Sequence, residues 1–315
     1  MSSMVRTSFI AALLASVLST SVPAGAQDVT GNAQEQDGLP QDSMLQQGHD
    51  WDAARASLVA RTAGPMAGAI ARWEQLTASR SFPFDSYASF LLSYPGFPDE
   101  DRLRASAELR LGMEFVPPER VLAYFDRFPP LTNNGRAQYA VALMQLRPNA
   151  AEQPARAAWA GGEMSDGAES LIRSSYGAVL TQAEQDARMD ALLWQRSRPA
   201  AERQLALASP ARQSVFAARL SILQGGDGAT GDPAAAGDPG YLYNRSRGLR
   251  SFGRGAEAAS LLANSPALSR RPFDETLWVE ELLVAARAGS ARDAQRIASR
   301  VDEAFAPGAD ISAKG

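Results

Sequence analysis

Residues 181–223 read TQAEQDARMDALLWQRSRPAAERQLALASPARQSVFAARLSIL, and they carry the clearest signals of the fold class. Thr181 and Glu184 have the spacing of a capping box, in which each side chain accepts a hydrogen bond from the backbone amide of the other residue. Apolar residues follow at the spacing of one helix face (Met189, Leu192 and Leu193). A serine and a proline at 209–210 then open a second helix, because proline suits the first helical turn. This stretch therefore predicts one helix after Thr181 and another that ends near residue 223.

Similar signals divide the rest of the chain into helices from Asp50 onward. A proline or a capping side chain opens most of the predicted helices, and glycine or proline ends most of them. The predicted starts outside 181–223 are Asp50, Pro65, Phe84, Pro98, Pro118, Thr132, Ser165, Asp238 and Ser290. No stretch alternates apolar and polar residues for long enough to predict a half-buried strand. We therefore predict an all-α fold.

Two neighbouring segments near the C-terminal end look like copies of one hairpin. Gly253 and Gly289 are 36 residues apart, and similar residues recur at the same interval (Glu257 and Asp293, Ala258 and Ala294, Leu262 and Ala298). This interval resembles a tetratricopeptide-type helical hairpin. Stacked hairpins bury their apolar faces against immediate neighbours, so a chain of this length need not build one large core. We predict an α-solenoid, or superhelix, of helical hairpins over residues 49–305, with a flexible glycine-rich insertion at 225–237.

The composition excludes several kinds of chemistry. The 315 residues include no cysteine, one histidine (His49) and one lysine (Lys314). Thiolate nucleophiles, paired-histidine metal motifs and lysine-containing phosphate loops therefore have no residues to build them. The 31 basic and 35 acidic side chains leave a net charge of −4, which is not typical of a nucleic-acid-binding protein. We expect no cofactor, no bound metal and no nucleic-acid partner.

The first 26 residues have the pattern of a secretory signal peptide. Arg6 supplies a positive start, residues 9–18 form a short apolar run, and Ala24 and Ala26 have the spacing of a cleavage site. The apolar run is about half of the roughly 20 residues that a membrane-spanning helix needs. We expect cleavage after Ala26 and a periplasmic protein without a membrane span, the alternative being an uncleaved anchor. Residues 27–48 are polar and predict a disordered leader.

Several segments resemble a known family. They are 73–76 (WEQL), 84–98 (FDSYASFLLSYPGFP), 186–194 (DARMDALLW), 209–212 (SPAR) and 297–302 (IASRVD), and they are similar to soluble lytic murein transglycosylases. The similarity is to the N-terminal superhelical, U-shaped region of that family. The resemblance implies enzymes that cleave peptidoglycan glycan strands between N-acetylmuramic acid and N-acetylglucosamine, leaving an anhydro end. In the family, one glutamate of a C-terminal lysozyme-like domain acts as acid and then as base.

The catalytic motifs of that family occur here only as fragments in reversed order. The family's domain carries a glutamate–serine pair followed downstream by a methionine–glutamine motif, whereas here Met144 and Gln145 precede Glu169. Glu169 also suits the first turn of a helix that Ser165 caps, where the helix dipole favours an acid. We therefore predict no catalytic residue. We interpret the chain as the non-catalytic superhelical region, with residues 306–315 as a tail that marks a truncation point.

The leading functional hypothesis is binding to peptidoglycan glycan strands, with cell-wall synthesis proteins as further candidate partners. Four arginines are the candidate substrate-binding residues, because guanidinium groups bind carboxylates such as those of stem peptides (Arg245, Arg247, Arg250 and Arg254). The alternative is that these arginines cover an outer helix face. A second hypothesis is a non-enzymatic periplasmic scaffold, since solenoids offer long surfaces to extended peptides.

Overall fold

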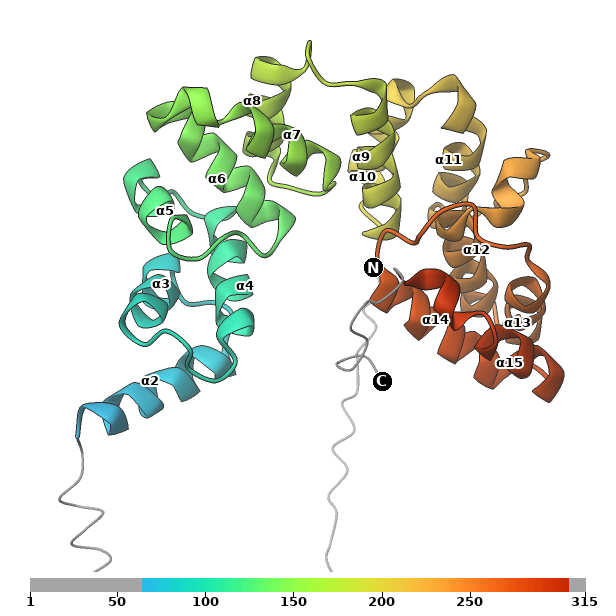
Figure 1. The fold of residues 1–315 in the computed structure, drawn as a ribbon, viewed down its shortest axis with the longest axis horizontal. Helices are drawn as coiled ribbons and strands as arrows, with labels where there is room; N and C mark the ends of the chain where they lie inside the picture. The colour runs from blue at the N-terminus through green and yellow to red at the C-terminus, as the bar shows by residue number, and fades with distance from the viewer. Residues whose placement is uncertain (1–63, 306–315) are drawn as a thin grey trace, which may run out of the picture. The chain divides into compact units, whose positions relative to one another are not determined.

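The computed structural model describes residues 64–305, and every regular element within this range is a helix. Successive helices lie beside one another along the chain (Figure 1). The α-helices are α2 (Pro65–Ala78), α3 (Phe84–Ser93), α4 (Glu100–Leu111), α5 (Pro118–Phe125), α6 (Asn133–Leu146), α7 (Glu152–Ala160), α8 (Asp166–Tyr176), α9 (Gln182–Trp194), α10 (Arg198–Gln204), α11 (Pro210–Leu223), α12 (Pro239–Ser251), α13 (Gly255–Asn264), α14 (Glu275–Ala288) and α15 (Ala291–Ala298). Short 3-10 helices lie at Pro148–Ala150, Leu205–Leu207, Pro233–Gly237 and Val301–Ala304. The prediction of an all-α fold is confirmed.

Several predictions fall on residues that the structure does not describe. They concern the signal peptide at 1–26, the leader at 27–48, the helix expected after Asp50 and the tail at 306–315. Within residues 64–305, no helix combines the length and the apolar character that crossing a bilayer requires.

Side-chain caps start several helices where the sequence predicts them. The caps at Thr132, Ser165, Asp238 and Ser290 each accept a hydrogen bond from a backbone amide in the first turn of the following helix. Thr181 and Glu184 form the predicted capping box, in which the Thr181 amide donates to the Glu184 carboxylate at 2.7 Å. Such caps satisfy amides that have no partner inside the helix.

One helix starts later than predicted. The sequence predicts a helix from Pro98, whereas α4 begins at Glu100. Asp99 has a left-handed backbone with φ of 58°, which is incompatible with a right-handed helix. Glu100 and Asp101 therefore occupy the first turn of α4, and Asp99 lies just before it as the N-cap.

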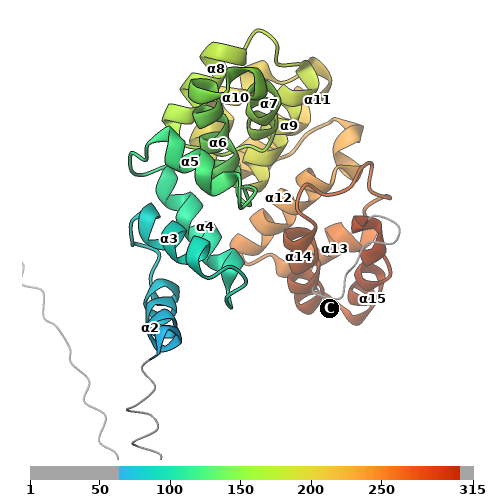
Figure 2. The same cartoon turned by 60° about the vertical axis from the view of Figure 1, so that its left-hand side comes forward.

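Each helix packs mainly against the next one or two helices in the chain. For example, α6 contacts α5 and α7 as direct neighbours, and it contacts α4 and α8 one place further on. Figure 2 shows this succession from a second side. The buried apolar side chains accordingly form a series of local clusters within 69–151, 137–172, 189–220 and 242–304, the last of which also includes Trp194. Burial against near neighbours characterises a solenoid, so the predicted stack of helical hairpins is confirmed.

Buried or partly buried carboxylates connect successive hairpins. Glu108 of α4 accepts hydrogen bonds from the backbone amides of Leu131 at 2.8 Å and Thr132 at 2.6 Å. Asp186 of α9 accepts in the same way from the amide of Ser209 at 2.7 Å. In each case the acid lies 23 to 24 residues before the amides that it binds. These hydrogen bonds attach α4 to the start of α6 and α9 to the start of α11.

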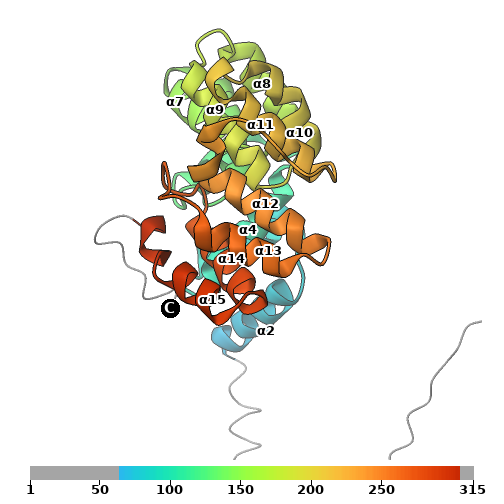
Figure 3. The same ribbon diagram turned by 90° about the vertical axis from the view of Figure 1, so that its right-hand side faces the viewer.

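The predicted 36-residue repeat corresponds to α13 and α15, which pack against each other (Figure 3). The two repeated glycines serve different purposes. Gly253 has φ of +75°, a backbone conformation that side chains disfavour. Gly289 lies so close to α13 that an added Cβ would be 2.4 Å from the Cβ of Ala259. The repeat therefore needs glycine once for a turn and once for close packing.

The glycine-rich insertion at 225–237 makes specific contacts with α11 and α12. The hydroxyl of Tyr241 donates a hydrogen bond to the carbonyl of Gly228 at 2.9 Å. Ser214 donates to the carboxylate of Asp232, and Ala235 is buried against apolar residues of α11. The sequence predicts a flexible segment here, and the structure shows the contacts by which it is attached to the neighbouring helices.

A buried charge network holds α9, α11, α12 and the loop before α14 together. Arg219 is fully buried and donates to Asp190, which is also buried. Arg270 donates to both oxygens of Asp190 at 2.7 and 3.0 Å and to Asp238 at 3.1 Å. Arg212 completes the network with a contact of 3.0 Å to Asp238. The Asp190–Arg270 pair joins residues that are 80 positions apart in the sequence.

The ionised form of Asp190 is favoured in this network. Burial alone would raise the pKa of its carboxyl group, but the neighbouring guanidinium groups of Arg219 and Arg270 outweigh burial and lower it. A buried carboxylate that is held ionised by two arginines depends on both partners remaining in place.

Candidate functional site

The four candidate arginines have different partners, and three of them lie on α12 while Arg254 precedes α13. Arg247 donates to the hydroxyl of Tyr243 at 3.1 Å, and its guanidinium lies 5.5 Å from the centre of that ring. Arg250 binds Glu281 through two hydrogen bonds of 2.9 and 2.5 Å, and Glu281 is buried. Arg250 therefore connects α12 to α14, whereas Arg247 contacts a tyrosine of its own helix. The other two, Arg245 and Arg254, line pockets.

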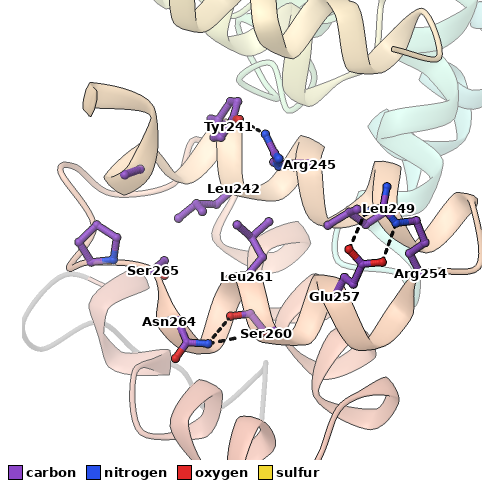
Figure 4. A pocket seen from close by; sticks show the side chains of 12 residues that line it. Tyr241, Leu242, Arg245, Leu249, Arg254, Glu257, Ser260, Leu261, Asn264 and Ser265 are labelled. Carbon is purple, nitrogen blue, oxygen red and sulfur yellow. Dashed lines mark hydrogen bonds and ion pairs between the residues drawn. The ribbon is translucent and has the colours of Figure 1, made fainter. Parts of the chain in front are cut away.

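Two adjoining pockets share Arg245, Leu249 and Arg254 in their walls. The larger pocket has a volume of about 480 Å³ and lies between α12 and α13 (Figure 4). Its other lining residues are one acid, Glu257, and residues that are mostly apolar or small and polar (Ala236, Tyr241, Leu242, Ser260, Leu261, Asn264, Ser265 and Pro266). The smaller pocket has a volume of about 270 Å³ and lies between α12, the end of α11 and the insertion at 225–227. We call these the α13 pocket and the insertion pocket.

Arg245 is the available cation of the two pockets. Arg254 is neutralised by Glu257, to which it donates two hydrogen bonds of 2.7 and 2.6 Å. These hydrogen bonds from Arg254 also lower the pKa of the Glu257 carboxyl group. Arg245 instead donates to the hydroxyl of Tyr241 (Figure 4), and within residues 64–305 no carboxylate lies within ion-pair distance of it. Its positive charge is therefore free to bind an anionic group in either pocket.

The insertion pocket also contains an acid. Asp227 lines this pocket and is exposed. Its carboxylate accepts a hydrogen bond from the amide of Ala229 at 2.9 Å, and it has no ion pair with another described residue. Phe252, which is 63% exposed, lines the same pocket. The insertion pocket thus presents a positive and a negative side chain beside an aromatic ring.

Glu169 is part of an ion-pair cluster. Its carboxylate lies 3.0 Å from Arg188 and 3.1 Å from Arg203, so it connects α8 to α9 and α10. Arg188 is almost fully buried, and burial lowers the pKa of its guanidinium to about 10. Met144, from the other motif fragment, packs against the first apolar cluster. Both fragments therefore have structural partners.

Asp227, Tyr241 and Phe252 are site residues that sequence reasoning did not identify. One signal was present, because Tyr241 precedes Arg245 by four residues and so lies on the same helix face. Nothing in the neighbouring sequence marks Asp227, which lies in the insertion.

Among residues 64–305, no group of three or more acids and histidines could hold a metal ion.

Comparison with protein families, with curated proteins and with solved structures finds no significant match to this chain.

Proposed function

We propose that this chain is a periplasmic peptidoglycan-binding module, equivalent to the non-catalytic superhelical region of a lytic transglycosylase. The proposal depends mainly on Arg245. This cation lines two adjoining pockets and has no carboxylate partner among the described residues. Peptidoglycan stem peptides carry carboxylates, and guanidinium groups bind carboxylates through charge-assisted hydrogen bonds. The segments that resemble transglycosylases support the same interpretation.

Retention on purified peptidoglycan sacculi tests the proposal. The purified chain should sediment with sacculi, and Arg245→Gln should reduce the bound fraction. Arg120→Gln is the matched control, because Arg120 is an exposed arginine far from α12 in the sequence that pairs with Asp85 at 2.8 Å. The proposal fails if the unmodified chain stays in the supernatant. We also expect no release of anhydromuropeptides, which mass spectrometry would detect.

A protein scaffold is the second candidate function. It is favoured by an apolar surface at the end of α4, where Met113 is 64% and Phe115 is 88% exposed. Met113 and the neighbouring Leu109 line a pocket of about 510 Å³ that extends to the starts of α6 and α8. Exposed apolar surface of this kind is typical of protein-interaction sites. Absence of sacculus binding by the unmodified chain, together with binding of periplasmic protein that Phe115→Ser loses and Arg245→Gln retains, would favour the scaffold function.

A further inference from the structure

We infer that the insertion pocket binds a free α-amino-acid group, with Arg245 binding its carboxylate and Asp227 its ammonium. This inference rests on the proposed function, since such a group occurs at the free end of the diaminopimelate residue in a stem peptide. Arg245 and Asp227 line one pocket and have opposite charges, and neither forms an ion pair with another described residue. A ligand that carries both charges on one carbon satisfies both side chains at once.

The size of the insertion pocket suits this group. Its volume of about 270 Å³ corresponds to roughly nine water molecules at the density of the liquid. An amino-acid head group fills only part of that space, which leaves room for the methylene chain that joins it to the peptide. The exposed ring of Phe252 offers an apolar surface to such a chain.

The two charged side chains come from different segments, and one tyrosine connects those segments. Arg245 donates to the hydroxyl of Tyr241, and that hydroxyl donates to the carbonyl of Gly228, the residue after Asp227. Gly228 has φ of +64°, and an added Cβ would lie 2.2 Å from a side-chain carbon of Ile222. The insertion is therefore held against α11 and α12 at the point where Asp227 enters the pocket. Tyr241 is a positioning residue, because it orders both charges before a ligand arrives.

The adjoining α13 pocket can accept the remainder of the stem peptide. Arg245 and Leu249 form part of both pockets, so a ligand can extend from one into the other. Leu261 and Pro266 give the larger pocket an apolar surface for alanine methyl groups, and Ser260 provides a hydroxyl for peptide amides. A short peptide with small side chains matches this mixture.

Calorimetric titration with three soluble stem tripeptides tests the inference. The first ends in diaminopimelate, the second carries an amidated carboxyl group at the free end of that residue, and the third has lysine in its place. All three retain the ammonium group at the end of the third side chain, but only the first has a free carboxylate on the same carbon. We expect the first to bind about 10- to 100-fold more tightly than the other two, as is usual for a hydrogen-bonded charged group.

Single substitutions test which charged group of the peptide each side chain of the pocket binds. Arg245→Gln should abolish the preference for diaminopimelate over lysine, and Asp227→Asn should weaken binding of all three peptides, because all three carry the ammonium group. Tyr241→Phe should weaken binding of the diaminopimelate peptide more than that of the lysine peptide. Arg120→Gln should change none of these ratios. Equal affinity of the unmodified chain for all three peptides would overturn the inference.

The failure of this inference can be distinguished from failure of the proposed function. Sacculus binding without discrimination among the peptides would overturn only the inference. Discrimination among the peptides without sacculus binding would support the inference and overturn the proposed function. Absence of binding to either would overturn both.

Discussion

Replacing Asp190 with asparagine would remove a central negative charge from the buried network while keeping the shape of the side chain. Asp190 is 5% exposed and binds two arginines, one of which, Arg219, is fully buried. After the change, Arg219 would keep Asn244 at 2.8 Å and Asp238 at 4.0 Å, and Arg270 would keep Asp238 at 3.1 Å. Breaking a buried ion pair on one side costs about 3–5 kcal/mol. Because partners remain, we expect a loss near the lower end, about 3 kcal/mol.

Urea unfolding followed by tryptophan fluorescence measures this loss. Trp194 lies in the same region and stacks on Tyr243 with ring centres 4.2 Å apart, so its emission reports on the affected packing. With a urea dependence of about 3 kcal/mol per M, the midpoint should fall by about 1 M. The pKa of Asp190 is lowered in the folded protein, so its stabilisation is present above the ordinary carboxyl pKa and is lost as the pH falls. The difference between the two proteins should therefore shrink in acid.

A surface pair of similar geometry provides the control. Asp126 binds Arg147 with two hydrogen bonds of 3.0 and 2.8 Å, but the two side chains are 42% and 51% exposed. Water screens such a pair, so Asp126→Asn should shift the midpoint far less. Equal shifts for Asp190→Asn and Asp126→Asn would refute the argument that burial makes the network important.

Three further changes test other parts of the fold. The hydrogen bond from Arg156 lowers the pKa of Glu184 from 4.5 to about 2. The stabilisation by Glu184 is therefore present above pH 4.5 and is lost as the pH falls toward 2. The thermal unfolding temperatures of Glu184→Gln and the unmodified chain should differ at pH 7 and converge near pH 2. Gly289→Val should destabilise the chain by about 1–3 kcal/mol in urea unfolding, because the new side chain would overlap Ala259, and an unchanged midpoint would contradict that packing. Gly68→Ala should stabilise by about 0.5–1 kcal/mol, since Gly68 lies inside α2 with open space around it, and a loss of stability would show that the glycine is needed.

Helix positions were predictable because their signals are local. The capping box of Thr181 and Glu184 needs only residues within one turn, and it forms as predicted. The exception is Asp99, whose backbone delays the start of α4. Aspartate tolerates a left-handed backbone but also suits the start of a helix, so its residue type alone does not decide between the two.

The candidate site was predictable only in part. All four arginines between 245 and 254 look alike in the sequence, and the choice between binding and packing depends on partners elsewhere. Arg250 is held by Glu281, which lies 31 residues further on, whereas Arg245 faces the pockets. Asp227 joins Arg245 because the insertion folds back onto α12 through Tyr241.

By itself, the amino-acid sequence determined that this chain is helical and where most of its helices begin, because capping, proline and glycine act within one turn. It also determined which chemistry is missing, because a chain with one histidine and no cysteine cannot build sites that need more. Only the tertiary structure decided which charges neutralise each other. Asp190 and Arg270 meet across 80 residues, and Arg250 is held by a glutamate 31 residues further on. Ion pairing depends on distances of a few ångströms between distant segments, and no local pattern contains that information.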